Sequence, residues 1–415
     1  MSNIELKYAI PEDTQKIIKV IGVGGGGGNA VTHMFRQGIR DVSFVLCNTD
    51  VQAMKNSEVP VKICLGPKTT KGLGAGNNPK IAKEAALESE NEIRNMLDDG
   101  TQMAFITAGM GGGTGTGAAP VIAKIAKEMD ILTVGIVTIP FKFEGRPKIL
   151  QALTGVEEMS RNVDALLVVN NERLYDIYKD LTVINAFAKA DDTLAIAAKS
   201  IAEIITVEGI INLDFADVRS TLKEGGVALM SDGYGEGEER LGNAIEDAFK
   251  SPLLNNDNIF NAKKVLFNIL FNGEEEGADL TIQEVEAYIT VFMERFRRDD
   301  IEVIWGLARD VSLGKKIKFT LLASGFGLMD ETLFDTPQPG DETERSKEDI
   351  RRYQDYLINK YYGNMQPTIS TLTPEEMEDE NFIRIIEDNP TYKRNSSLLE
   401  GERNKILAEN RSRNN

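Results

Sequence analysis

Short apolar runs alternate with longer segments of helical periodicity over about the first 170 residues of the chain. The apolar runs predict six strands, at 17–23, 42–47, 61–65, 103–107, 131–139 and 165–169. Apolar residues spaced three and four positions apart predict helices at 29–37, 80–97, 118–129 and 148–162. The run at 131–139 is apolar almost throughout, as in a parallel strand buried on both faces. This alternation predicts an α/β fold with a doubly wound, mostly parallel sheet.

A second pattern begins after the sixth predicted strand. Residues 184–206 predict one long, alanine-rich helix, which serves either as a central strut between two domains or as an ordinary surface helix. Its length and position favour the strut. Beyond it, a smaller α/β domain is predicted, with strands at 226–230, 264–271, 301–307 and 317–323 and helices at 239–250 and 282–297. After about residue 329, Asp, Glu, Thr and Pro predominate, which predicts a flexible tail with one helix at 343–362.

Charge and residue usage narrow the functional classes. The 415 residues carry a formal net charge of −18, which disfavours binding to nucleic acid or directly to anionic lipid. No run reaches the roughly 18 apolar residues of a membrane span, and the N-terminus lacks the apolar core of a signal peptide. Cys47 and Cys64 lie in apolar runs, and His33 is the single histidine. We therefore expect a cytoplasmic protein with reduced cysteines, a structural histidine and no metal centre built on His and Cys.

Seven residues rich in glycine join the predicted strand at 103–107 to the helix at 118–129. They are Gly111, Gly112, Gly113, Thr114, Gly115, Thr116 and Gly117. Backbone N–H groups and the positive end of a helix dipole converge at such a junction, so it suits a phosphate. The loop has no Lys after its last glycine and is therefore not a Walker A loop. A plain turn would need only one or two glycines.

A second glycine-rich segment, Gly24 to Gly28, follows the first predicted strand. With Asp50 further along, its G-x-G-x-x-G pattern alone suits an NAD-dependent oxidoreductase. A dinucleotide fold needs one such loop for its pyrophosphate. Two loops at the ends of adjacent parallel strands instead suit a nucleoside triphosphate, and the NAD enzyme remains the alternative.

The sequence GGGTGTG, between AFITAGM and AAPVIA, resembles the signature of the tubulin and FtsZ superfamily. Roughly residues 14–327 are similar to the FtsZ family of bacterial cell-division GTPases. The resemblance implies Mg²⁺-dependent hydrolysis of GTP to GDP and phosphate by head-to-tail homopolymers of a division ring at midcell. A related filament that moves DNA, and a nucleotide-binding scaffold without hydrolysis, are the alternatives. Intact Asp214 and Asp217 argue against the scaffold.

The resemblance also implies which residues contact the nucleotide. The residues at 111–117 would cradle the β- and γ-phosphates, and Glu144 would contact the ribose, helped by Lys148 or by Arg146. An Asp carboxylate at the base can accept from guanine N1–H and N2–H₂ together, which adenine cannot offer. The remaining implied contacts are Gly25, Gly26 and Asn29 in the first loop, Ala75, Gly76 and Asn77 at the γ-phosphate, and Asn171, Phe187 and Asp192 at the guanine.

An acidic loop, Gly209 to Val218, directly follows the long predicted helix. Taken alone, Asp214 and Asp217 are most simply explained as caps of a helix that starts near Ala216. Their match to the family's NxDFADV loop implies instead that Asn212, Asp214 and Asp217 organise a water or a metal for catalysis. The loop lies at the other end of the long helix from the nucleotide, so it must act on a neighbour's GTP. A contact of this kind is heterologous and generates filaments.

The tail contains one segment with apolar anchors, Phe382 to Arg394, which predicts a peptide that binds a membrane-tethering adaptor and division regulators. Direct insertion into the membrane is not expected. The predicted organisation is then an N-terminal extension at 1–13, a GTP-binding domain at 14–183, a central helix at 184–206, a C-terminal α/β domain with the catalytic loop at 207–328, an acidic linker at 329–380, and the partner-binding peptide with a basic tip at 381–415.

Overall fold

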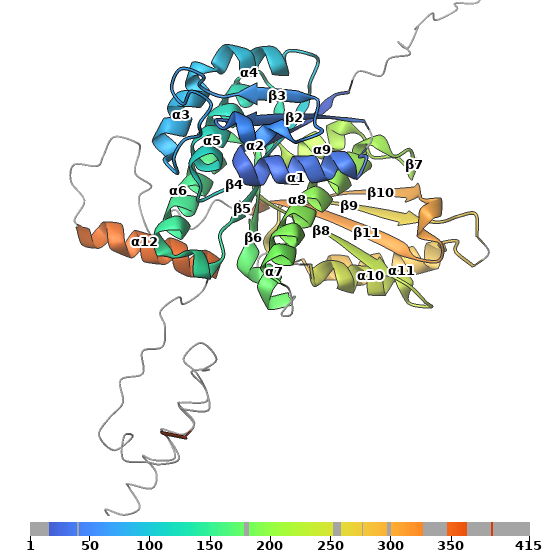
Figure 1. The fold of residues 1–415 in the computed structure, drawn as a ribbon. Helices are drawn as coiled ribbons and strands as arrows, with labels where there is room; N and C mark the ends of the chain where they lie inside the picture. The colour runs from blue at the N-terminus through green and yellow to red at the C-terminus, as the bar shows by residue number, and fades with distance from the viewer. Residues whose placement is uncertain are drawn as a thin grey trace, which may run out of the picture. The chain divides into compact units, whose positions relative to one another are not determined.

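One eleven-stranded sheet organises the part of the chain that the computed structural model describes, in the order β3-β2-β1-β4-β5-β6-β8-β11-β9-β10-β7 (Figure 1). The described residues are 16–39, 41–177, 182–251, 259–275, 277–296, 300–326, 347–362 and 383–384. They divide into two compact units, 1–346 and 347–415. The predicted N-terminal extension, and the linker and tail peptide apart from 347–362 and 383–384, lie outside the described residues.

The first six strands are parallel and confirm the predicted α/β sheet. They are β1 (Ile18–Val23), β2 (Val42–Asn48), β3 (Val61–Cys64), β4 (Met103–Gly109), β5 (Leu132–Ile139) and β6 (Ala165–Asn170). Every residue of β1 is buried, and all but one residue of β5 is buried, because helices cover both faces of a doubly wound sheet. β1 pairs with β2 on one side and with β4 on the other. The direction of the connections therefore reverses between β1 and β4.

Two helices start earlier than the sequence predicted. α1 spans Gly24–Arg36 and α5 spans Gly113–Glu128, so both glycine-rich segments are the first turns of helices rather than loops. Close packing overrides glycine's low helix propensity. A Cβ at Gly27 would lie 2.2 Å from the Thr107 carbonyl oxygen, and one at Gly117 would lie 2.0 Å from that of Pro79.

The helix predicted at 80–97 is wrong as a single element. α3 (Pro79–Glu88) ends and α4 (Glu90–Leu97) begins at Ser89. The Ser89 hydroxyl accepts a hydrogen bond from the Gly66 N–H at 3.0 Å, and this bond ties the break to the loop after β3. The short α2 (Val51–Lys55), capped by Asp50, was not predicted. α6 (Arg146–Asn162) and α7 (Asn171–Ile177) complete this half.

The remaining strands continue the same sheet as a smaller half with its own core. The strands are β7 (Gly209–Ile211), β8 (Gly226–Gly235), β9 (Lys264–Phe271), β10 (Glu302–Arg309) and β11 (Ile317–Phe326), and the helices are α9 (Phe215–Leu222), α10 (Arg240–Phe249) and α11 (Ile282–Glu294). β8 pairs with β6 through only two residue pairs, Ala165 with Gly226 and Leu166 with Val227. Packed aromatic rings of Phe267, Phe292 and Phe319 fill the core of this half.

The long helix α8 (Val183–Thr206) runs between the two halves of the sheet (Figure 1). Its buried alanines, among them Ala195, Ala198 and Ala202, share one core with strands of the first half and with Leu266 and Leu322 of the second. This arrangement confirms the central helix. In the second unit, α12 (Lys347–Tyr362) confirms the predicted tail helix.

Candidate functional site

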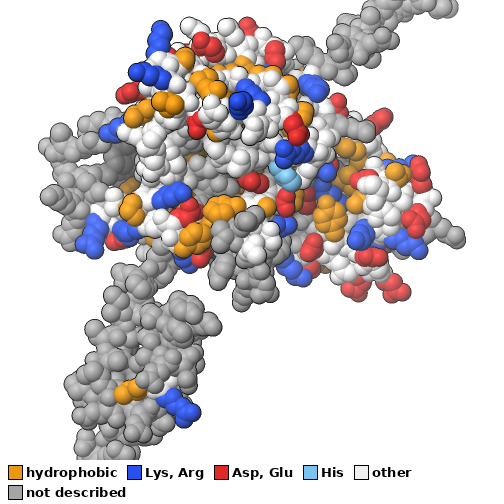
Figure 2. Space-filling view, in the orientation of Figure 1, with side chains coloured by type: hydrophobic (Ala, Val, Ile, Leu, Met, Phe, Trp, Pro, Cys, Tyr) orange, Lys and Arg blue, Asp and Glu red, His pale blue; other side chains and the backbone are white. Residues whose placement is uncertain are grey.

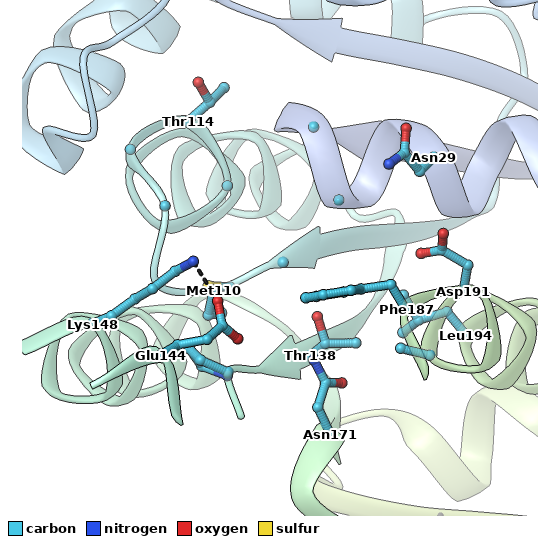
Figure 3. Close-up of a pocket in the computed structure, with 18 residues that line it drawn as sticks. Asn29, Met110, Thr114, Thr138, Glu144, Lys148, Asn171, Phe187, Asp191 and Leu194 are labelled. Carbon is cyan, nitrogen blue, oxygen red and sulfur yellow. Dashed lines mark hydrogen bonds and ion pairs between the residues drawn. The ribbon is translucent and has the colours of Figure 1, made fainter. Parts of the chain in front are cut away.

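A pocket of about 410 Å³ opens where β1, β4 and β5 end (Figure 3). Val23 at the end of β1 pairs with Ala108 of β4, so α1 and α5 begin side by side. In open α/β sheets, ligands bind at the carboxyl ends of strands where the connections reverse, and this is such a point. The pocket is lined by Gly25, Gly26, Asn29, Gly109, Met110, Gly112, Gly113, Thr114, Gly115, Thr138, Pro140, Glu144, Lys148, Asn171, Phe187, Ala190, Asp191 and Leu194.

Both helices present uncapped N-termini at this pocket. Neither Val23 before α1 nor Gly112 before α5 makes a side-chain capping hydrogen bond, and neither helix has an acidic residue in its first turn. The first N–H groups of a helix have no partner within the helix, and its N-terminus carries a partial positive charge. Two such ends together form a site for an anion with several oxygens.

The glycines at the pocket fall into two groups, in which glycine is needed for different physical reasons. A Cβ at Gly25 or Gly112 would meet no atom within 4 Å, so these two glycines keep space in the pocket itself. A Cβ at Gly113 would lie 2.9 Å from the Asn78 nitrogen, and one at Gly115 would lie 2.4 Å from the Gly109 carbonyl oxygen. The second group is therefore required for the packing of α5, whatever the pocket binds.

Some predicted phosphate contacts do not line the pocket. Thr116 is buried, and its hydroxyl accepts a hydrogen bond from the Gly111 N–H at 2.8 Å, which braces the turn internally. Gly117 packs against Pro79. The segment of Ala75, Gly76 and Asn77 approaches the start of α5 but lies outside the pocket wall.

One wall of the pocket carries an ion pair. The Lys148 ammonium donates to Glu144 Oε2 at 2.5 Å (Figure 3), and Glu144 Oε1 accepts from the Phe141 N–H at 2.9 Å. Lys148 lines the pocket and Arg146 does not. This pair presents a fixed carboxylate and a cation next to the glycine end, an arrangement that can hold sugar hydroxyls.

An aromatic ring and an unsatisfied amide define the remaining wall. Phe187 is 43% exposed and stands edge-on to Phe141, with ring centroids 5.3 Å apart. Asn171 is buried, yet its Oδ1 has no hydrogen-bond partner among the described residues. Buried polar atoms are nearly always paired, so this oxygen is available to a ligand.

The acidic residue in this wall is Asp191, and the structure does not bring the predicted Asp192 to the pocket. Residues three, four and seven positions apart share a helix face, so Phe187 on α8 shares its face with Ala190, Asp191 and Leu194. The Asp192 carboxylate points elsewhere, with Oδ1 2.7 Å from His33 Nε2. The helical spacing from Phe187 would have identified Asp191 from the sequence.

Burial raises the pKa of Asp191 to about 6; His33 acts against this rise and Asp192 adds to it. The other lining residues that sequence reasoning did not name are Gly109, Met110, Thr138, Ala190 and Leu194. Ala190 and Leu194 could have been found by the same helical spacing from Phe187.

None of the three predicted catalytic residues lines the pocket. Asp214 caps α9: it accepts from the Asp217 N–H at 3.0 Å, and Asp217 accepts from the Asp214 N–H at 2.9 Å. Asn212 Oδ1 accepts from the Gly209 N–H at 2.8 Å. Between Asp191 and Thr206, α8 advances by about 22 Å at 1.5 Å per residue. The acidic loop and the pocket therefore lie towards opposite ends of α8, as do α9 and α7 in Figure 1.

In the described part of the chain, no group of three His, Cys, Asp or Glu residues is placed to hold a metal ion, and no helix has the length and hydropathy to cross a bilayer. On the described part of the face in Figure 2, basic side chains are interspersed with acidic ones and form no broad basic patch.

Comparisons with known proteins agree with this geometry. The model of the Tubulin/FtsZ family GTPase domain matches residues 17–179, and that of the FtsZ family C-terminal domain matches residues 226–327. Cell division protein FtsZ of Porphyromonas gingivalis is 54% identical over 407 residues, which cover 92% of this chain and 86% of that protein. FtsZ of Pseudomonas aeruginosa is 45% identical over 75% of this chain and 77% of that protein.

A solved structure described as an empty FtsZ dimer from M. jannaschii has a TM-score of 0.68 and 38% identity, and the match covers 76% of this chain and 89% of that one. These matches do not favour an NAD-dependent oxidoreductase or a DNA-moving filament. The pocket at the β1–β4 reversal lies in the matched GTPase domain. With the second half of the sheet matched as well, the chain belongs to the FtsZ family, the cell-division GTPases of the tubulin superfamily.

Proposed function

We propose that this GTPase assembles head to tail and hydrolyses GTP where two copies meet. The observation that carries the proposal is the separation of the two parts of the site. The glycine end of the pocket offers N–H groups and the Thr114 hydroxyl, but Asn212, Asp214 and Asp217 are not among the residues that line the pocket. The exposed acidic loop, towards the other end of α8, has the carboxylates of Asp214 and Asp217.

In the proposed binding mode, the phosphates lie against Gly25, Gly26 and the start of α5. The open space over Gly25 and Gly112 and the uncapped helix ends support this placement. The ribose lies at Glu144 and Lys148. The base stacks on Phe187, between Asn171 and Asp191, whose carboxylate accepts from guanine N1–H and N2–H₂. Asp191 takes the role first assigned to Asp192.

We further propose that Mg²⁺ reaches the site on the phosphates rather than on a set of protein ligands. Mg²⁺ keeps several waters and is commonly held by substrate phosphates with one or two carboxylates. The ion would neutralise charge on the transferred phosphoryl group.

Catalysis in this scheme requires little more than positioning. Asn212, Asp214 and Asp217 of one subunit orient a water in line with the γ-phosphate held by the next. Ile210, which is 56% exposed on β7 beside the loop, supplies apolar surface for the contact. Because the two contacting surfaces differ, association does not close and produces a filament. Removal of the γ-phosphate weakens the contact.

A mixing experiment tests the shared site. Gly112→Leu fills the pocket and leaves Asp214 intact, whereas Asp214→Ser leaves the pocket intact. Each variant alone should lose most GTP turnover. A mixture should recover part of it, because one interface combines an open pocket with an intact loop. Full turnover by Asp214→Ser alone, or no recovery by two folded variants that assemble together, would refute the proposal.

The cellular role follows from the same family membership. We propose that the filaments form the division ring at midcell in the cytoplasm, tethered to the membrane through an adaptor that binds the 381–415 peptide. The six-part division of the chain, with boundaries at 13, 183, 206, 328 and 380, belongs to this proposal. Fluorescent full-length protein should form a band at midcell, and a variant carrying Ile386→Asp should not.

A further inference from the structure

A second pocket of about 380 Å³ adjoins the nucleotide pocket and shares Asn29 and Asp191 with it. Its other lining residues include His33, Arg36 and Asp192. We propose that His33, held in place by Asp192, is a positioning residue for guanine recognition, which favours the ionised Asp191 carboxylate and makes the preference for guanine depend on pH. This inference rests on the proposed contact between Asp191 and the base.

The geometry places the pair of His33 and Asp192 next to the Asp191 carboxylate. Asp191 forms part of the wall common to both pockets, so one side of it borders the base site and the other borders the second pocket. There, His33 on α1 approaches Asp192 on α8, with Nε2 and Oδ1 2.7 Å apart. The pair bridges the two helices that flank the pocket, and it lies next to Asp191 along the chain.

Two other basic side chains lie near this pair. Arg36, one turn further along α1, pairs with Glu58 at 3.2 Å. Lys189 lies 4.0 Å from Asp192 Oδ2. The polar neighbours Thr32 and Ser57 share a hydrogen bond of 2.7 Å. Among the basic groups, His33 is the one whose electrostatic effect lowers the pKa of Asp191.

The electrostatic effects on Asp191 agree with this arrangement. Burial raises the pKa of the Asp191 carboxyl to about 6, His33 lowers it, and Asp192 raises it. An ionised carboxylate accepts from both guanine donors, whereas a protonated one turns an O–H towards them. The preference for guanine should therefore be present above about pH 6 and be lost as the pH falls through that value.

The test compares the binding of GDP with that of inosine diphosphate, IDP, which lacks the 2-amino group. The phosphates of both ligands titrate alike, so the ratio of their affinities reports on the base contact alone. Calorimetry on the full-length protein from pH 5 to 8 should show a ratio of about tenfold at pH 8, the effect expected for one charge-assisted hydrogen bond. The ratio should approach one at pH 5.

Two variants of His33 then predict opposite shifts. His33→Gln removes the cation, so the fall in the ratio should move to higher pH. His33→Arg keeps a permanent charge, so the fall should move to lower pH. Arg36→Gln, on the same helix and in the same pocket, serves as the matched control and should leave the midpoint in place.

Each outcome has a distinct meaning. If both His33 variants weaken GDP and IDP equally at every pH, His33 is only structural and the inference is wrong, while Asp191 can still hold the base. If Asp191→Asn leaves the ratio at the wild-type value, the proposed base contact itself fails. The inference is supported if the midpoint of the pH dependence shifts in opposite directions in the two His33 variants and stays unchanged in Arg36→Gln.

Discussion

Asp214 and Asp217 hold each other in a reciprocal capping box, each accepting a hydrogen bond from the backbone N–H of the other. Taken alone, the sequence of this loop was most simply explained by a helix cap, and the structure contains that cap. A cap and a catalytic role do not exclude one another, because each carboxylate has a second oxygen. The two roles can be separated by experiment.

We predict that Asp214→Ser and Asp214→Ala both reduce GTP turnover by about 100-fold or more, the usual contribution of a positioned acid or base. Serine is a good N-cap and alanine is not, so only Asp214→Ala should also lose about 1 kcal/mol of unfolding free energy. Steady-state GTPase assays and urea unfolding measure the two effects. If Asp214→Ser hydrolysed GTP at nearly the wild-type rate and only Asp214→Ala were impaired, Asp214 would be a helix cap without a catalytic role.

Substitutions in the two groups of glycines should impair different properties, GDP binding in one group and stability in the other. Gly112→Leu should abolish GDP binding at nearly unchanged stability, because a Cβ there meets no protein atom. Gly117→Ala should destabilise the protein by about 1–3 kcal/mol through overpacking against Pro79. Calorimetric titration with GDP and urea unfolding distinguish these outcomes. If Gly112→Leu bound GDP normally, the proposed position of the phosphates at the start of α5 would be wrong.

Lys318 on β11 predicts a large stability effect far from the pocket. Its buried ammonium lies 2.9 Å from Glu203 Oε2 on α8 and 3.2 Å from Asp232 Oδ2 on β8. Lys318→Ala should cost about 3–5 kcal/mol, because it leaves a buried carboxylate unpaired. Urea unfolding at pH 7 measures this loss, and Lys318→Ala with Asp232→Asn should recover part of it. A loss below 1 kcal/mol for the single variant would contradict the prediction.

The same lysine predicts a pH dependence. Burial acts to lower the pKa of Lys318, but Asp232 and Glu203 outweigh it and raise the pKa above its ordinary value. The stabilisation should therefore be complete below about pH 10, the unfolded pKa of lysine, and be lost only as the pH rises through the higher folded value. The stability difference between wild type and Lys318→Met should thus be equal at pH 7 and pH 9. A smaller difference at pH 9 would show that the pKa is not raised.

Removal of residues 347–415 should leave turnover and assembly intact. The sheet and both apolar cores use residues no later than Phe326. GTPase assays and light scattering with GTP check this expectation, and midcell localisation should be lost. A truncated chain that folds but does not assemble would place part of the contact surface in the tail.

Elements with a strong local pattern were predictable from the sequence. The apolar run Lys264–Phe271 became β9 with the same bounds, and α8 begins one residue before its predicted start. The early starts of α1 and α5 were not predictable, because the reason lies in contacts such as that between Gly117 and Pro79, which are distant in sequence. β7 was also missed, since Ile210 and Ile211 are largely exposed and acquire strand geometry only by pairing with β10.

The candidate site shows the same division. Two glycine-rich segments at adjacent strand ends were apparent from the sequence, and the structure places them at one pocket. Asp191 was missed because motif matching was given more weight than helical spacing. The orphaned oxygen of Asn171 and the pair of His33 with Asp192 depend on tertiary packing, which no local pattern encodes.

The short junction between β6 and β8 has a mechanical consequence. The sheet is continuous there through two residue pairs only, so this junction resists shear less than the longer β5–β6 and β8–β11 pairs on either side of it. A load applied at β7 or α9 would shear a sheet at such a junction before it reached β1. The stiff element that spans the junction is α8, which shares a core with both sides and carries Phe187 and Asp191 in its first half. Traction on the end of the molecule at β7 and α9 would therefore reach the pocket through α8 more directly than through the sheet.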